Sequence, residues 1–195
     1  MAATARRSIG AQRNPASEAA ILTAARELLA EEGLAGFSIE AVARRARAGK
    51  PTIYRWWPDK TRLLLAVYMG LKEDVPEPDT GSLEGDLREF LINLFRFWRT
   101  TPAGPVFRSI IAEAQTDAEA GAAFKAYHDM RLARTAAGFA RNGLALDKAM
   151  LLTELTVNYA WGQLLSGRLD PGADEIAEVA AMLVSGCRAL HASRG

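Results

Sequence analysis

The residue types best suited to chemistry gather in one short segment, KPTIYRWW. Within it, Ile53 and Trp57 stand one helical turn apart, so together they can anchor a helix on a neighbouring element. The hydroxyl of Thr52, the phenol of Tyr54 and the guanidinium of Arg55 are then left to point elsewhere. Such groups donate hydrogen bonds to phosphate oxygens and to the edges of bases. The segment therefore predicts a surface that contacts a nucleic acid.

Further basic side chains flank this segment. Arg44, Arg45, Arg47 and Lys50 come just before it or at its start. Lys60 is expected in the first turn of the next helix, where its ammonium group joins free backbone N–H groups that attract a phosphate. The whole neighbourhood is therefore suited to an anionic partner.

The charge of the chain is distributed unevenly along its 195 residues. The net charge is only +1, yet residues 1–62 contain 11 Lys/Arg against 6 Asp/Glu, whereas residues 63–195 contain 13 against 17. A basic first third followed by an acidic remainder indicates one segment that meets a polyanion and another that does not.

Composition and motifs argue against several other classes of protein. The chain is 49% hydrophobic and 24% charged, as expected for a soluble globular protein. It has no run of 18 apolar residues and no apolar stretch behind its basic N-terminus, so we expect a cytoplasmic protein without a membrane span or secretory signal. A single cysteine excludes an internal disulfide framework, and no nucleotide- or metal-binding motif is found, so neither a cofactor nor a metal is expected.

Apolar residues recur at helical spacing along most of the chain without strand-like alternation, which predicts an all-α fold of about nine helices. Pro15 is expected to open the first helix and Gly33 to close it. Ser38 is expected to cap the second, Pro58 to end the third and Asp59 to cap the fourth. The later helices are predicted at Leu83–Thr100, Pro105–Gln115, Asp117–Arg141, Asp147–Gly167 and Pro171–Leu190.

These elements predict three parts of the chain. Residues 1–14 are interpreted as a flexible basic arm, residues 15–72 as a DNA-binding domain and residues 82–195 as a C-terminal domain. Residues 38–57 contain two helices of about 8 residues and a three-residue turn, which is the size of a helix-turn-helix whose second helix enters the major groove. A helical hairpin with a solvated charged face would have the same pattern.

The segment Ile21–Tyr68 resembles the N-terminal domain of TetR-family transcriptional repressors. The matching pieces are ILTAARELLAEEG, FSIEAVARRA and TIYRWWPDK, the last of which marks the recognition helix and the start of the fourth helix in that family. Later, FRSIIAEAQTD and NYAWGQLLSGRLD resemble one C-terminal subgroup. The resemblance implies a three-helix helix-turn-helix domain linked through a fourth helix to a ligand-binding and dimerisation domain.

One position departs from the pattern of the family. Arg47 stands where the turn usually has a glycine. A positive φ at that position would cost a residue other than glycine about 1 kcal/mol. Gly49 could relieve the turn, or the turn could take a slightly different form.

The resemblance also implies roles for individual residues. Contacts with the DNA backbone are expected from Ser38, Thr52, Tyr54 and Lys60. Contacts at or near the bases are expected from Lys50, Pro51 and Arg55, with Arg45 and Arg47 as further DNA-binding candidates. Trp56 is expected to pack beneath the recognition helix, because aromatic side chains at such positions usually belong to the core.

For the C-terminal domain, the resemblance implies a homodimer and a small-molecule inducer. The last two helices, Asp147–Gly167 and Pro171–Leu190, would form a four-helix interface between two copies. The candidate ligand-binding residues are Phe95, Trp98, Phe107, Tyr127, His128, Asn158 and Trp161. Few charges stand among them, which favours an apolar or aromatic ligand. The implied protein is no enzyme but a sequence-specific repressor, released by its ligand from a near-palindromic operator.

Two other functional classes remain open at this point. Cys187 and His191 lie four residues apart on the last predicted helix and could act as a nucleophile and a base, although no third orienting residue is evident. A helical module that binds an acidic protein partner is the other class. If the logarithm of the binding constant fell with the logarithm of the salt concentration by about 0.9 per phosphate contact, DNA would be favoured over such a partner. Activation in place of repression also fits the sequence.

Overall fold

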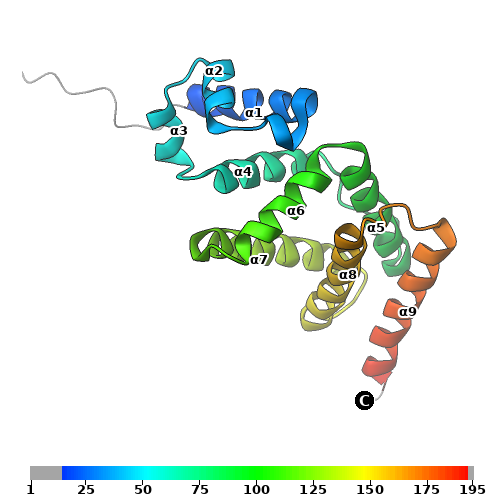
Figure 1. Ribbon diagram of the computed structural model, residues 1–195. Coiled ribbons are helices and arrows are strands. Elements are labelled where there is room, and N and C mark those ends of the chain that lie inside the picture. The colour runs from blue at the N-terminus through cyan, green and yellow to red at the C-terminus, as the bar shows by residue number, and fades with distance from the viewer. Residues whose placement is uncertain (1–14, 193–195) are drawn as a thin grey trace, which may run out of the picture. The chain divides into compact units, whose positions relative to one another are not determined.

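The computed structural model describes residues 15–192, and the burial of side chains as far as Cys187. Within these residues the chain forms nine helices and no strand (Figure 1), which confirms the all-α prediction. Contacts divide the chain into two compact units, with the boundary in the sequence between Lys60 and Thr61. The basic arm predicted at residues 1–14 lies outside the described residues.

The first unit contains α1 (Pro15–Gly36), α2 (Ile39–Ala46) and α3 (Lys50–Trp56). Helix α1 packs against α2, and α2 packs against α3. The regular geometry of α1 is interrupted at Gly33, where φ is 66°, at the residue that the sequence predicts as its end. The remaining residues of α1 continue the helix after this kink.

Local signals explain how the two short helices begin and end. Ser38 has an extended backbone, and its Oγ accepts a hydrogen bond from the N–H of Ala41 at 3.1 Å, so it caps α2 as predicted. At the end of α3, the N–H of Trp57 donates to the carbonyl of Ile53 at 2.8 Å. Pro58 follows at once and cannot continue the helix. Ile53 and Trp57 are both buried, as their spacing predicts.

The turn between α2 and α3 contains one residue with an unfavourable backbone conformation. Arg47 has φ 51° and ψ 38°, in the left-handed region that favours glycine. Its N–H donates to the carbonyl of Arg44, and the N–H of Ala48 donates to the carbonyl of Ala43 at 3.0 Å. Gly49 has φ −72°, so it does not relieve the turn. The strain that the sequence suggests is therefore located at Arg47.

Replacing Arg47 with glycine is expected to raise the free energy of unfolding by about 1 kcal/mol, because glycine takes a positive φ without steric cost. Urea denaturation of the full chain measures the effect. Arg47→Ala is the matched control, since it removes the side chain and keeps the strained φ. If both variants changed stability equally, the strain assigned to Arg47 would be absent.

The second unit is built from the remaining helices. They are α4 (Lys60–Glu73), α5 (Leu83–Thr100), α6 (Ala103–Ala114), α7 (Ala118–Ala140), α8 (Leu146–Ser166) and α9 (Ala173–Ala192). Helix α7 lies alongside α8, and α5 contacts α6, α8 and α9 (Figure 1). Contacts place α4 from Thr61 onward in this unit, whereas the sequence assigns it to a domain spanning 15–72.

Aromatic side chains form the centre of the second unit. The ring of Tyr68 stacks on Phe107 with their centroids 4.5 Å apart, and Trp98 stacks on the same phenylalanine at 5.9 Å. The indole N–H of Trp98 donates to the hydroxyl of Tyr68 at 2.9 Å. Burial raises the pKa of Tyr68 well above its ordinary value. These contacts tie α4 to α5 and α6.

Hydrogen bonds to a buried carboxylate stabilise the connection between α4 and α5. Asp86 is 2% exposed and accepts hydrogen bonds from the backbone N–H and hydroxyl of Thr80, at 2.6 and 2.8 Å. Its other oxygen accepts from the side-chain amide of Asn142 at 2.8 Å. Burial alone would raise the pKa of Asp86, but these hydrogen bonds outweigh it and leave the pKa below its ordinary value.

The variant Asp86→Ala is expected to lower the free energy of unfolding by about 2–3 kcal/mol, because it leaves buried donors unsatisfied. Since the folded-state pKa is lowered, the contribution of Asp86 is present at neutral pH and is lost as pH falls through that pKa. Chemical denaturation at pH 7 and below pH 4 tests both statements. Asp79→Ala, at an exposed position of the same connection, is the control. Equal effects of the two variants would contradict the assignment.

Candidate functional site

Helix α3 has a buried face and an exposed face. Ile53 is fully buried, and Trp56 and Trp57 are 8% and 7% exposed, with their rings in edge-to-face contact at 5.5 Å. The expectation that Trp56 packs beneath the helix is therefore confirmed. On the other face, Tyr54 is 44% exposed and Arg55 is exposed as well. A large phenol kept in water at this position is suited to contact a partner.

The remaining predicted DNA-binding residues differ in exposure. Arg47, Lys50, Pro51 and Lys60 are exposed, and Ser38, Arg45 and Thr52 are half-buried. Lys60 is the first residue of α4, and its Nζ lies over the ring of Phe37 at 5.7 Å. All these side chains belong to, or border, α2, α3 and the turn that joins them.

Two of the basic residues are paired with carboxylates. Lys50 Nζ lies 2.6 Å from Glu40 Oε1, and this hydrogen bond raises the pKa of the lysine and lowers that of the glutamate. Both side chains are about half exposed, so a phosphate can replace the glutamate. Arg45 is held differently, because it donates to Glu31 on α1 and is three-quarters buried. It joins α2 to α1, which makes it less available to a partner than Lys50.

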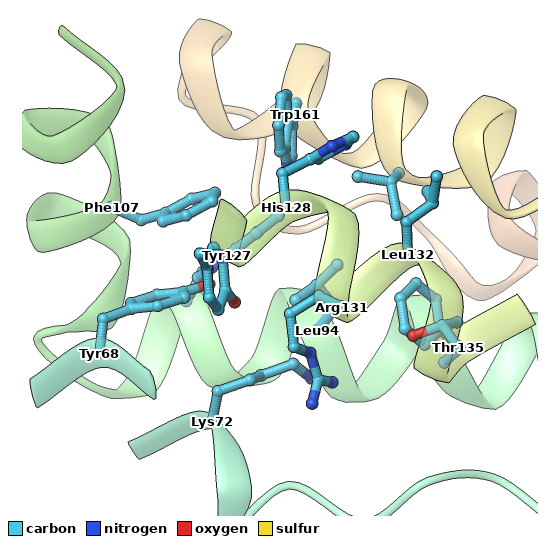
Figure 2. A pocket seen from close by; sticks show the side chains of 13 residues that line it. Tyr68, Lys72, Leu94, Phe107, Tyr127, His128, Arg131, Leu132, Thr135 and Trp161 are labelled. Carbon is cyan, nitrogen blue, oxygen red and sulfur yellow. The ribbon is translucent and has the colours of Figure 1, made fainter. Parts of the chain in front are cut away.

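The second unit contains a partly open cavity of about 50 Å³ between α4, α5, α6, α7 and α8 (Figure 2). Five of the seven predicted ligand-binding residues line it: Trp98, Phe107, Tyr127, His128 and Trp161. The rings of Phe107 and Trp161 meet at 5.8 Å, and His128 approaches Trp161 at 5.3 Å. Burial raises the pKa of Tyr127 to about 12, so its hydroxyl stays protonated and can donate a hydrogen bond.

The other two predicted ligand-binding residues lie elsewhere and are not part of this cavity. Phe95 is buried next to Trp98 and Tyr159, at 6.4 and 6.2 Å, and is absent from the cavity lining. It follows Leu94, which does line the cavity, so it points about 100° away around α5. Asn158 is exposed on α8.

Sequence reasoning missed two cations at the cavity, Lys72 from α4 and Arg131 from α7. Lys72 is 7% exposed, and its Nζ lies 5.7 Å from the ring centres of both Phe90 and Phe97. Burial, together with the charge of Arg131, lowers the pKa of Lys72 to about 8. In the sequence, the sign of a buried Lys72 is its position at the end of an apolar segment, LLLAVYMGLK. The helical periodicity alone does not distinguish this lysine from a surface residue.

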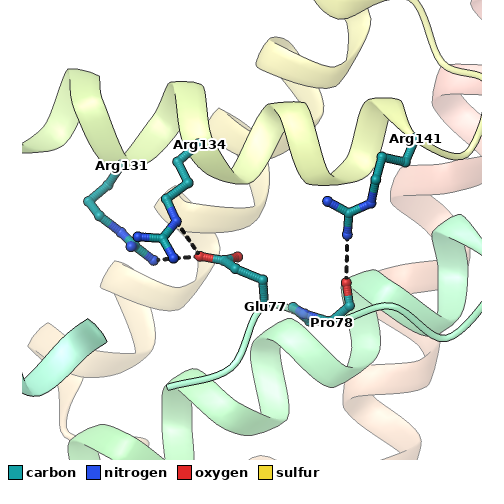
Figure 3. A network of polar contacts seen from close by, with 5 residues as sticks. All are labelled: Glu77, Pro78, Arg131, Arg134 and Arg141. Carbon is teal, nitrogen blue, oxygen red and sulfur yellow. Dashed lines mark hydrogen bonds and ion pairs between the residues drawn. The ribbon is translucent and has the colours of Figure 1, made fainter. Parts of the chain in front are cut away.

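One carboxylate from the connection between α4 and α5 holds two arginines of α7 (Figure 3). Glu77 Oε1 lies 3.1 Å from Arg131 and 3.4 Å from Arg134. Arg141, the residue directly after the end of α7, donates to the carbonyl of Pro78 at 3.0 Å. A single carboxylate therefore faces two guanidinium groups here, and positive charge predominates at this side of the cavity.

Other kinds of site find less support. In the part of the chain that the structure describes, no group of three or more His, Cys, Asp or Glu is placed to hold a metal ion. No helix among the described residues is long and apolar enough to cross a bilayer. Cys187 is buried, and burial raises the pKa of its thiol, which opposes an activated nucleophile. The side chain of His191 lies outside the described residues.

Comparison with known families agrees with the helix-turn-helix geometry. Residues 21–67 match the model described as "Bacterial regulatory proteins, tetR family", and residues 77–183 match "Tetracyclin repressor-like, C-terminal domain". The chain belongs to the TetR family. This family consists of bacterial regulatory proteins, in agreement with the resemblance in residues Ile21–Tyr68.

Individual members of the TetR family match to different extents. The uncharacterized HTH-type transcriptional regulator YdeS of Bacillus subtilis (strain 168) is 36% identical over 109 residues, which are 55% of this chain and 54% of that protein. The chain thus spans about half the length of this curated relative. The crystal structure of the TetR family transcription regulator SCO0332 is 28% identical, with a TM-score of 0.73, over 87% of this chain and 97% of that one.

A more distant structure shares only the fold. The Streptomyces coelicolor TetR family protein ActR, solved in complex with (S)-DNPA, has a TM-score of 0.61 and 15% identity. The two chains overlap over 91% of this chain and 99% of ActR.

Proposed function

We propose that this TetR-family protein is a transcriptional repressor that binds a near-palindromic operator as a homodimer and leaves it when a small molecule enters the cavity of the second unit. The observation that carries the proposal is α3, whose Ile53, Trp56 and Trp57 are buried while Tyr54 and Arg55 remain exposed. A short helix anchored in this way can present one face to the major groove.

We assign the side chains around α3 to two roles, the orientation of the protein on the duplex and the recognition of the base sequence. Tyr54, Thr52 and Lys60 are suited to phosphate contacts, which set the orientation on the duplex without reading its sequence. Arg55 and Lys50 carry groups that can bind guanine at its O6 and N7 atoms. The ion pair of Lys50 with Glu40 would open on binding, because the lysine would then contact DNA in place of the glutamate.

A stripe of exposed apolar residues supports dimerisation through α8. Leu151, Leu155 and Leu165 are 43%, 46% and 56% exposed, and they lie on one face of the helix with Gly162 between them. Asn158 falls within the same stripe, so in the proposed dimer it would lie at the interface. On α9, Met182 is 66% exposed. An apolar face of this kind on a single chain is suited to burial against a second copy.

The position of α4 supports the proposed release by a ligand. Tyr68 and Lys72 of this helix line the cavity, and α4 begins only four residues after the end of α3 at Trp56. A cavity of about 50 Å³ is too small for an aromatic ring, so a ligand of that size must displace part of the lining. Movement of α4 then changes the spacing of the two recognition helices. The coupling free energy expected for such a change is about 1–3 kcal/mol.

Selection from a random duplex library at near-physiological salt tests the proposed DNA binding. We expect enrichment of a near-palindrome by the full chain, and its loss with Tyr54→Ala or Arg55→Ala. Arg168→Ala, which removes an exposed arginine of the second unit, is the matched control and should select the same sequence. Salt-sensitive binding without enrichment would contradict sequence-specific recognition, and no binding by the folded protein would contradict the proposed function itself.

A further inference from the structure

Among the described residues, Lys72 is a buried cation that forms no ion pair with a carboxylate, although the charge of Glu77 acts to raise its pKa. It is 7% exposed, and its recorded contacts are the rings of Phe90 and Phe97. Its side chain enters the cavity from α4 (Figure 2). Burying a charge without a counter-ion is unfavourable, so folding alone gives no reason for an ammonium group at this position.

The surroundings of Lys72 add to the positive charge. Arg131 reaches the same cavity from α7, and Arg134 follows it on that helix. Glu77 is shared by the two arginines at 3.1 and 3.4 Å, so its single charge does not neutralise them and Lys72 together. From α4 and α7, the hydroxyls of Tyr68 and Tyr127 are neutral. This side of the cavity is therefore suited to an anion.

The opposite side of the cavity is aromatic. Phe107 packs against Trp161 at 5.8 Å and against Tyr127 at 6.2 Å, in edge-to-face geometry in both pairs. Figure 2 shows the rings of Phe107 and Trp161 on the side away from Lys72, with Tyr127 between them and Lys72. Offset stacking and edge-to-face contacts of this kind favour a further aromatic ring over an alkyl chain. The cavity thus combines an aromatic wall with a cationic end.

We propose that the ligand of this cavity is a small aromatic carboxylate whose anionic group pairs with Lys72 and Arg131 while its ring lies against Phe107 and Trp161. The inference rests on the proposed function, because it names the class of ligand for the same site. It keeps the aromatic character that the sequence favours for the ligand and adds a negative charge. A carboxylate at this point supplies the counter-ion that Lys72 lacks and hydrogen-bonds two cationic donors.

Titration of the full chain with matched acids and amides tests the charge requirement. The probes are benzoate and 2-naphthoate, each compared with its uncharged amide of nearly equal shape. Binding is followed by calorimetry and by the fluorescence of Trp98 and Trp161, which line the cavity. We expect at least one acid to bind about tenfold or more tightly than its amide, because the charge-assisted pair is lost in the amide.

Variants locate the effect at the cavity. Lys72→Met keeps most of the side-chain volume and should remove the preference for the acid, while the affinity for the amide stays within about twofold. Lys125→Met, at an exposed lysine of α7 that pairs with Asp129, is the control and should keep the preference. Thermal denaturation confirms that each variant is folded.

Several outcomes would overturn this inference: equal affinity for acid and amide, no binding of either acid, or an acid preference that survives Lys72→Met. Operator binding is measured on the same preparations without any probe. A protein that binds its selected operator but shows no acid preference refutes the ligand class and leaves the proposed function intact. A protein that prefers the acid but binds no DNA refutes the repressor.

Discussion

Replacing Leu155 and Leu165 with glutamate is expected to convert the proposed dimer to a monomer and to lower operator affinity by about 100-fold or more, because joining two binding modules raises affinity by about 10²–10⁴-fold. Both side chains are half exposed on the single chain, so glutamate is tolerated without a partner. In a dimer of the proposed kind, however, four carboxylates would be buried close together without counter-ions.

Sedimentation equilibrium and titration of the selected duplex measure the two effects of this double variant. Met130→Glu is the matched control, since Met130 is 43% exposed on α7, outside the stripe on α8. It should leave both the mass and the operator affinity unchanged. A double variant that remains dimeric would place the interface elsewhere, and a monomer with full operator affinity would show that dimerisation is unnecessary for recognition.

Lys72→Met is expected to raise the free energy of unfolding at pH 7 by about 1–3 kcal/mol, since methionine needs no counter-ion in a buried position. The folded state lowers the pKa of Lys72 from 10.5 to about 8. Between these two pH values the unfolded chain binds more protons than the folded chain, so the wild-type protein gains stability as pH rises. The destabilisation caused by burying the charged Lys72 is therefore complete below pH 8 and disappears as pH rises towards 10.5. A gain in stability combined with loss of acid binding is the signature of a residue kept for function.

Chemical denaturation of the wild-type chain and of Lys72→Met at pH 7, 8.5 and 10 measures the difference in their free energies of unfolding. The stability gain should shrink steadily with rising pH, while Lys125→Met, at a position 75% exposed, should show no such trend. Comparison of the two variants removes the effect of other groups that titrate in this range. A pH-independent gain, or a loss of stability at pH 7, would contradict the unpaired buried state of Lys72.

Much of the fold was predictable because its signals are local. Ser38, Ser82 and Asp117 each cap a helix by accepting a backbone hydrogen bond, as their positions before apolar runs indicate. Where the capping signal was ambiguous, the predicted ends of the helices differ from the observed ones by a few residues. The helix predicted at Asp147–Gly167 begins one residue earlier, at Leu146, so Asp147 lies in its first turn. The assignment of α4 to the second unit depends on long-range contacts, which local patterns do not report.

The candidate sites were predictable to different degrees. The exposed residues of α3 follow from the spacing of Ile53 and Trp57, so the DNA-contact face could be proposed from sequence. The cavity could not be delimited in the same way, because its residues come from five helices. Lys72 and Arg131 look like ordinary surface charges in sequence, and only packing reveals that they face a cavity. Asn158 interrupts an apolar stretch and is therefore a candidate ligand-binding residue in the sequence, but the rotation of α8 exposes it.

Hydroxyl-radical footprinting of the full chain on its selected duplex tests the central claim most directly, since it reports where two copies of α3 contact the backbone. Two protected patches on one face of the duplex, with centres about 10 base pairs apart, are expected for a two-fold dimer that reads successive major grooves. Both patches should disappear with Tyr54→Ala and persist with Arg168→Ala. A single patch, or protection that does not depend on Tyr54, would contradict recognition by a pair of α3 helices.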